Sequence, residues 1–78
     1  MLSTDQRRAL QLLDEAEPRG CTAAVMRLAH GFKAELLGRL VHDGLASMAA
    51  ETITAGNESL AVTRLRITGA GRRALQVQ

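Results

Sequence analysis

Aromatic side chains are almost absent from this 78-residue chain, and their scarcity limits the ways in which it can bind a ligand. Phe32 is the only aromatic residue, so the chain cannot offer the stacked rings on which single-stranded RNA or DNA is commonly held. We therefore expect no RNA partner. The core must consist mainly of aliphatic side chains and methionine, and we place Phe32 in it, between the second and third predicted helices.

Cysteine and long apolar runs are equally scarce. Cys21 is the only cysteine, so no disulfide can form within the chain, which is typical of a cytoplasmic protein. No apolar run approaches the roughly 18 residues that a membrane span requires. The charges of Asp5, Arg7 and Arg8 also do not fit a signal peptide. We expect a cytoplasmic protein without a membrane partner.

The chain also lacks an arrangement of residues that would indicate catalysis or metal binding. His30, His42 and Cys21 match no known spacing of metal ligands. Residues 69–71 (Gly-Ala-Gly) lack the lysine and the spacing of a phosphate-binding loop. We predict no enzymatic activity, no cofactor and no metal site.

Charge is distributed unevenly along the chain. Ten Lys and Arg against eight Asp and Glu give a formal net charge of +2. All eight acids lie before residue 59, and we expect those at the end of the first helix to form a solvated patch: Asp14, Glu15 and Glu17. The last twenty residues hold no acid and four arginines, Arg64, Arg66, Arg72 and Arg73. An anionic partner would meet this end first, although the arginines could also serve solubility alone.

Helical periodicity predicts the first helix. Ser3 and Gln6 form a capping box at its start, and Pro18 ends it at or before Glu17. Its apolar stripe contains Ala9, Leu10, Leu13 and Ala16.

Two shorter helices follow, separated by a tight turn that contains Gly31. The second runs from the N-cap Thr22 through Ala29, and the third roughly from Lys33 to Asp43. Short helices joined in this way are typical of a helix-turn-helix. The predicted inward residues are Val25, Leu28 and Ala29 on the second helix, and Leu36, Leu37, Leu40 and Val41 on the third.

The hydrophobic period then changes to that of a β-hairpin. Strands at residues 46–54 and 60–67 flank Gly56 and Asn57, a pairing that sets Met48 opposite Leu65 and Ala46 opposite Ile67. Thr68 caps a short last helix. We predict one α+β domain over residues 1–78, with three helices, a two-stranded hairpin and a C-terminal helix. The face away from Met48 collects Ser47, Ala49, Glu51, Ile53, Leu60, Val62, Arg64 and Arg66.

In this order of elements the chain resembles the winged helix-turn-helix domains of small bacterial, MarR-like transcription regulators. The resemblance lies in residues 28–32 (Leu-Ala-His-Gly-Phe), in residues 36–45 ending in Asp-Gly-Leu, and in residues 67–72 (Ile-Thr-Gly-Ala-Gly-Arg). It implies double-stranded DNA as the partner, with the third helix in the major groove and the hairpin, or wing, on the phosphates.

The chain departs from that pattern in three respects. Lys33 stands where a Ser or Thr cap is usual, and Gly69 stands where an acid is common. The chain also has no room for the dimerisation helices of MarR-like proteins.

Candidate DNA-binding residues follow from the predicted faces. The exposed stripe of the third helix, which would contact base edges, contains Glu35, Gly38, Arg39 and His42. Residues that would contact phosphates need only charge and reach, and they are Lys33, Arg64, Arg66, Arg72 and Arg73.

Two partner hypotheses remain open besides DNA. Small size and an apolar cluster near the hairpin tip, formed by Ile53, Leu60 and Val62, suggest a homodimer. The alternative function is a winged helix that binds another protein and no nucleic acid, because a fold does not fix a function. Glu35, the modest net charge and the exposed apolar tip of the hairpin favour that alternative.

Overall fold

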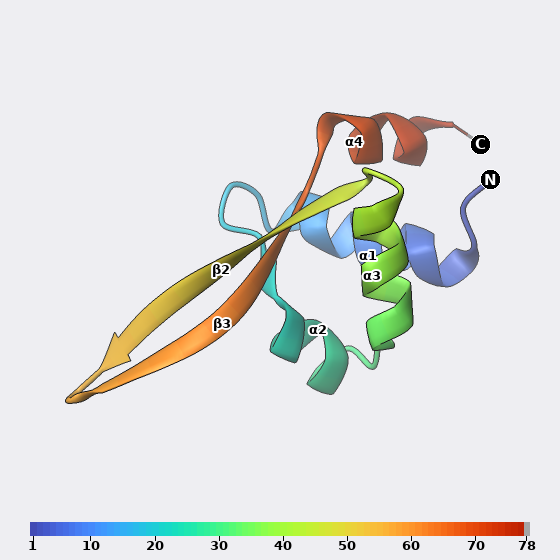
Figure 1. Cartoon of the computed structure of the whole chain (residues 1–78). Coiled ribbons are helices and arrows are strands. Elements are labelled where there is room, and N and C mark those ends of the chain that lie inside the picture. Colours follow the sequence, from blue (N-terminus) through green and yellow to red (C-terminus); the bar gives the residue numbers. More distant parts are fainter. Residues whose placement is uncertain (78) are drawn as a thin grey trace.

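The helices gather around the base of a long β-hairpin in the computed structural model, which describes residues 1–77 (Figure 1). The described chain forms an α+β fold with four helices and a three-stranded antiparallel sheet, in the order α1 (Thr4–Glu15), β1 (Cys21–Thr22), α2 (Ala23–Leu28), α3 (Ala34–His42), β2 (Ala46–Ala55), β3 (Glu58–Ile67) and α4 (Gly69–Gln76).

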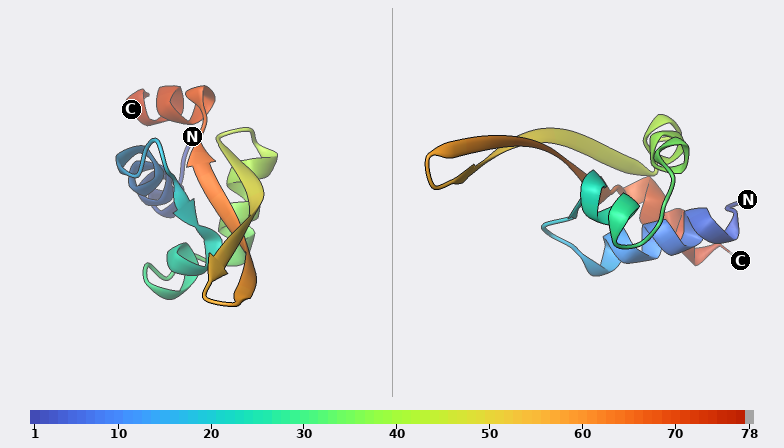
Figure 2. Two further views of the ribbon diagram at one scale, coloured as in Figure 1. Left: turned by 90° about the vertical axis from the view of Figure 1, so that its left-hand side faces the viewer. Right: turned by 90° about the horizontal axis from the view of Figure 1, so that it is seen from below.

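The hairpin extends far beyond the helices. β2 and β3 pair one for one from Ala46 with Ile67 to Ala55 with Glu58, which confirms the predicted register. Gly56 has a φ of 63°, as the first central residue of a two-residue hairpin turn requires. Both strands are slightly longer than predicted. The long hairpin makes the molecule elongated, with extents of 48 × 22 × 20 Å. Figure 2 shows the hairpin as a curved arm on one side of the helical body.

The prediction of a two-stranded sheet was wrong. Cys21 pairs with Leu65 and Thr22 with Arg64, so β1 is a third strand and the sheet order is β1-β3-β2. A two-residue strand is too short to produce a periodic pattern, which explains why the sequence did not reveal it. Thr22 also caps α2 as predicted, because its Oγ1 accepts a hydrogen bond of 3.2 Å from the Val25 N–H.

Local capping signals determine the helix ends. The Ser3 N–H donates to Gln6 Oε1 at 2.8 Å and the Gln6 N–H donates to Ser3 Oγ at 3.1 Å, which confirms the capping box. Thr68 Oγ1 accepts from the Gly71 N–H at 3.0 Å and caps α4. Gly71 is buried, and a Cβ at this position would overlap the carbonyl oxygen of Leu45. The glycine therefore allows α4 to pack closely against Leu45, the residue before β2.

The core lies between the helices and the base of the hairpin. Phe32 is 7% exposed, as predicted, and the Arg8 guanidinium lies 5.6 Å from its ring centroid. The buried hydrophobic residues that form the core are Ala9, Leu10, Leu13, Met26, Phe32, Leu37, Leu40, Ala46, Leu65 and Ile67.

The predicted inward face of the second helix was wrong. Met26 is fully buried, whereas Val25 is 45% and Leu28 is 86% exposed, and Ala29 is also exposed. A six-residue helix spans less than two turns, so its apolar residues do not define one stripe. The contact of α2 with β3 decides instead which side is buried.

A side chain of α1 holds the end of α4. Arg7 donates from Nη1 to the carbonyl of Leu75 and from Nη2 to the carbonyl of Val77, both at 3.1 Å. These carbonyls belong to the last turn of α4 and its cap, where backbone acceptors lack partners within the helix. Among the described residues, no helix has both the length and the apolar character needed to cross a membrane.

Candidate functional site

The exposed face of α3 contains all four residues that the sequence predicted for base contact. Leu37 and Leu40 anchor the helix in the core, so its opposite side faces outward. The exposed residues on that outward side, here called the α3 ridge, are Glu35, Gly38, Arg39 and His42. Lys33 precedes them at the N-cap, where its ammonium group cannot accept a hydrogen bond, so the helix begins without a side-chain cap.

A shallow groove separates the α3 ridge from α2 and the hairpin. Its volume is about 260 Å³, and Gly38 lies on its α3 side while Arg27 lies on its α2 side. Arg27 was not among the residues predicted from the sequence, because the outward face of α2 depends on the burial of Met26, which the sequence did not reveal. The groove is lined by Ala23, Arg27, Ala34, Leu37, Gly38, Val41, Met48, Thr63 and Leu65.

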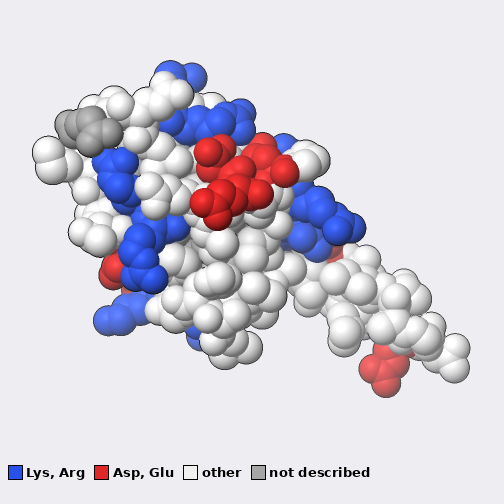
Figure 3. Space-filling model, turned by 180° about the vertical axis from the view of Figure 1, so that it is seen from behind, with Lys and Arg blue, Asp and Glu red and all other residues white. Residues whose placement is uncertain are grey.

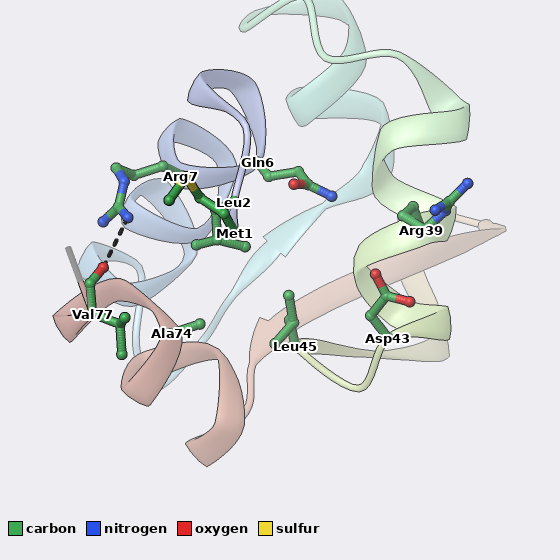
Figure 4. A pocket seen from close by; sticks show the side chains of 9 residues that line it. All are labelled: Met1, Leu2, Gln6, Arg7, Arg39, Asp43, Leu45, Ala74 and Val77. Carbon is green, nitrogen blue, oxygen red and sulfur yellow. Dashed lines mark hydrogen bonds between the residues drawn. The ribbon is translucent and has the colours of Figure 1, made fainter.

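A second hollow, of about 700 Å³, lies on the other side of α3 (Figure 4). Gln6 points from α1 toward α3, while Arg39 and Asp43 come from α3 itself. Arg7 also lines the hollow, but its guanidinium turns toward the Val77 carbonyl. The α3 ridge thus stands between two hollows and projects from the body.

Two of the predicted phosphate contacts bind Glu17 instead. Arg66 donates to Glu17 from Nε at 3.0 Å and from Nη2 at 3.1 Å, and Arg72 donates from Nη1 at 3.1 Å. The hydrogen bond from Arg66 lowers the pKa of Glu17 below its ordinary value, and Arg72 lowers it further, against the opposing effect of desolvation. The same pairing raises the pKa of Arg66. The expectation that Glu17 belongs to a solvated patch was therefore wrong, since its side chain is 21% exposed and doubly paired.

Arg64 also has an intramolecular partner. It forms a hydrogen-bonded ion pair with Glu51, its diagonal neighbour on the same face of the hairpin. Within residues 1–77, no ion pair involves the other two predicted phosphate contacts, Lys33 and Arg73. The structure thus brings Lys33 close to the α3 ridge but places Arg64, Arg66 and Arg72 in internal ion pairs.

The outer part of the hairpin carries acidic and apolar side chains. Residues 40–63 contain no Lys or Arg, and their charges on the strands are those of Glu51 and Glu58. In the view of Figure 3, basic and acidic atoms both lie over the body, basic atoms lie at its junction with the hairpin, and the far end shows acidic atoms. Ile53 and Leu60, which the register sets opposite each other, are 38% and 51% exposed, and Val62 is half-buried.

The cysteine and histidines do not converge on a common site. Cys21 is half-buried in β1, and burial raises the pKa of its thiol, which disfavours the reactive thiolate. His30 stacks on Phe32 with ring centroids 6.3 Å apart, at the end of α2. In the described part of the chain, no group of three or more His, Cys, Asp or Glu could hold a metal ion.

Comparison of the chain with protein-family models, with curated protein sequences and with solved structures gives no match. The arguments about function therefore rest on the geometry of the chain itself.

Proposed function

We propose that this protein is a winged helix-turn-helix that binds double-stranded DNA, as small transcription regulators do, with α3 in the major groove. The observation that carries the proposal is the α3 ridge, which projects from a helix that Leu37 and Leu40 hold in the core. A recognition helix must present its outer side chains to base edges while its inner side stays fixed. The short link from α2 to α3 and the hairpin beside them support the same arrangement.

The phosphate contacts in this proposal come from the helices more than from the hairpin. Arg64, Arg66 and Arg72 each bind a carboxylate of their own chain, so turning toward a phosphate would break an existing ion pair. Arg27, Lys33 and Arg39 are exposed: Arg27 lines the groove from α2, Lys33 is the N-cap of α3, and Arg39 belongs to the α3 ridge. We assign the main phosphate contacts to these three residues.

The salt dependence of binding tests this assignment. Each phosphate contact contributes a slope of about −0.9 to log K against log salt, so three contacts predict about a 40-fold loss of affinity between 50 and 200 mM salt. Five contacts, the number predicted from sequence, would give about a 500-fold loss. The measurement is a fluorescence-anisotropy titration of a random duplex. Arg39→Ala should reduce the slope by about 1, whereas Arg73→Ala should leave it unchanged. Absence of binding at 50 mM salt would contradict the proposal.

Gly38 offers a test in which stability and binding change in opposite directions. A Cβ at Gly38 would meet nothing within 4 Å, so Gly38→Ala should stabilise the helix by about 0.5–1 kcal/mol. If α3 lies in the major groove, the added methyl group should hold the helix away from the bases and weaken binding by about fivefold. Gln11→Ala, on the exposed side of α1, is the control and should bind as the wild type does. Unchanged affinity in a stabilised Gly38→Ala variant would remove α3 from the interface.

The second candidate function is recognition of a protein partner, and the groove beside α3 favours it. Apolar side chains make up most of its lining, among them Leu37, Val41 and Met48. Such a groove suits the apolar face of a peptide or helix. Selection of displayed peptides against the wild type, with Met48→Glu as the counter-target, tests this function. Enrichment of peptides with regularly spaced apolar residues supports it, and no enrichment contradicts it.

A further inference from the structure

The outer edge of β2 is a long strand edge without the usual protection. β2 is the last strand of the sheet, so within residues 1–77 its backbone pairs on one side only, with β3. Edge strands in monomeric proteins are commonly protected by lysine, proline or a β-bulge. The ten residues of β2 include neither lysine nor proline, and each pairs one for one with β3, so the strand is regular throughout.

The exposed arm is also longer than the body can support by packing. Every residue from Ser47 to Ala61 is exposed, so both faces of the hairpin lack a covering layer over that range. A two-stranded hairpin by itself is marginally stable in water. Additional strand pairing at the free edge would supply backbone hydrogen bonds that the two-stranded arm lacks.

The turn determines which backbone groups point to the free edge. A two-residue turn is closed by a hydrogen-bonded pair, here Ala55 and Glu58, and the pairs then alternate along the strands. Odd-numbered residues of β2 therefore bond to β3. The even-numbered residues point to the free edge, and the exposed ones among them are Met48, Ala50, Thr52 and Thr54, whereas Ala46 is buried in the body.

We propose that β2 pairs antiparallel with β2 of a second copy of this chain, about a two-fold axis at Ala50. The sheet would then continue through both copies in the order β1-β3-β2-β2-β3-β1. A two-fold axis normal to the sheet keeps each face continuous, and it sets even-numbered residues opposite even-numbered ones. With Ala50 at the axis, Met48 of one copy lies opposite Thr52 of the other, and Thr54 lies at the level of Ala46.

The free edge of β2 is complementary to itself, which favours a second copy of this chain as the binding partner. In the Ala50 register the exposed edge positions Met48, Ala50 and Thr52 of each strand pair with Thr52, Ala50 and Met48 of the other. The single acid of β2, Glu51, lies opposite Ala49 of the other copy and keeps its own Arg64. A register centred on Glu51 would set two carboxylates face to face, which is unfavourable. A standard protein–protein interface buries about 800 Å² of accessible surface on each partner. For this chain that would be about 15% of its accessible surface of 5313 Å².

Cysteine cross-linking tests the register directly. In the Cys21→Ser background, Ala50→Cys places two thiols at the axis, with Cα atoms about 5.5 Å apart, within disulfide range. Thr54→Cys is the matched control, because the two copies of residue 54 lie eight positions apart along the ladder, about 27 Å. Under mild oxidation we expect a cross-linked dimer from Ala50→Cys and monomer from Thr54→Cys. Equal or faster cross-linking of Thr54→Cys would overturn the proposal in favour of contact through the tip residues Ile53, Leu60 and Val62.

The mass in solution provides a second readout. Sedimentation equilibrium of the wild type should give about twice the chain mass of 8.4 kDa at micromolar concentration. Ala50→Lys sets two like charges opposite each other across the axis, so we expect it to weaken the dimer by about fivefold. Thr54→Lys adds the same charge opposite Ala46 of the other copy and should weaken it much less. A wild type that stays monomeric at several hundred micromolar would overturn the pairing. DNA binding by a monomer would remain testable, so the two proposals can fail separately.

Discussion

At the scale of single residues, Glu17 shows how charge is used within this chain. One carboxylate binds two arginines that are 49 and 55 positions away in the sequence. It thereby joins the segment after α1 to β3 and α4. The interaction is electrostatic and partly exposed, so its contribution depends on the protonation of Glu17.

Acid should remove the contribution of Glu17. Its pKa is lowered in the folded state from the ordinary value of 4.5, so the stabilisation is complete above about pH 4.5 and is lost as pH falls through the lowered pKa. We expect Glu17→Gln to lower Tm at pH 7, and the difference from the wild type to shrink below pH 4.5. Thermal unfolding between pH 3 and 7 measures it. Glu15→Gln, an exposed neighbour, controls for the loss of one charge. A Tm difference that is constant with pH would contradict this reasoning.

At the scale of elements, the short helix α2 takes its orientation from its neighbours. Met26 points into the core against β3, although Val25 and Leu28 are equally apolar in sequence. With Met26 turned inward, Arg27 is exposed and lines the groove, where it provides a positive charge. The packing of one methionine therefore determines which part of α2 can contact a ligand.

A pair of alanine substitutions tests the orientation of α2. Met26→Ala removes a fully buried side chain and should lower the free energy of unfolding by about 3 kcal/mol. Leu28→Ala removes a side chain that is 86% exposed and should change it by less than about 0.5 kcal/mol. Urea denaturation of both variants gives the comparison. Equal losses in the two variants would show that the helix is turned differently.

At the scale of the whole molecule, the body and the arm have separable roles. The core contains β2 and β3 residues only near the base of the hairpin, namely Ala46, Leu65 and Ile67. The outer arm contributes length, exposed apolar surface and a free edge. Stability should therefore reside in the body and association in the arm.

Shortening the arm tests this separation. Deleting residues 52–55 and 58–61 joins Glu51 and Val62 through the turn of Gly56 and Asn57, and the hydrogen-bonded type of the closing pair is kept. The Glu51–Arg64 ion pair also stays. We expect the free energy of unfolding of the body to change by less than about 1 kcal/mol, while the mass in solution falls to that of one chain. Unfolding of the shortened chain would show that the arm supports the body.

Sequence patterns predicted the elements whose signals are local. The capping box at Ser3, the cap at Thr68 and the turn at Gly56 each depend on residues within a few positions of one another. The hairpin register followed from the turn, because a two-residue loop fixes every later pair. The exposure of the α3 ridge was predicted in the same way, from the helical spacing of apolar residues within a nine-residue segment.

Tertiary structure alone decided the features that join distant segments. The pairing of Cys21 with Leu65, the inward direction of Met26 and the binding of two arginines by Glu17 leave no periodic trace, because each depends on where another segment lies in space. The sequence by itself determined the helices, the turn and the charges, since backbone conformation responds to neighbouring residues. Only the folded chain decided which of those charges are neutralised internally, because electrostatic pairing depends on distance through space and not along the chain.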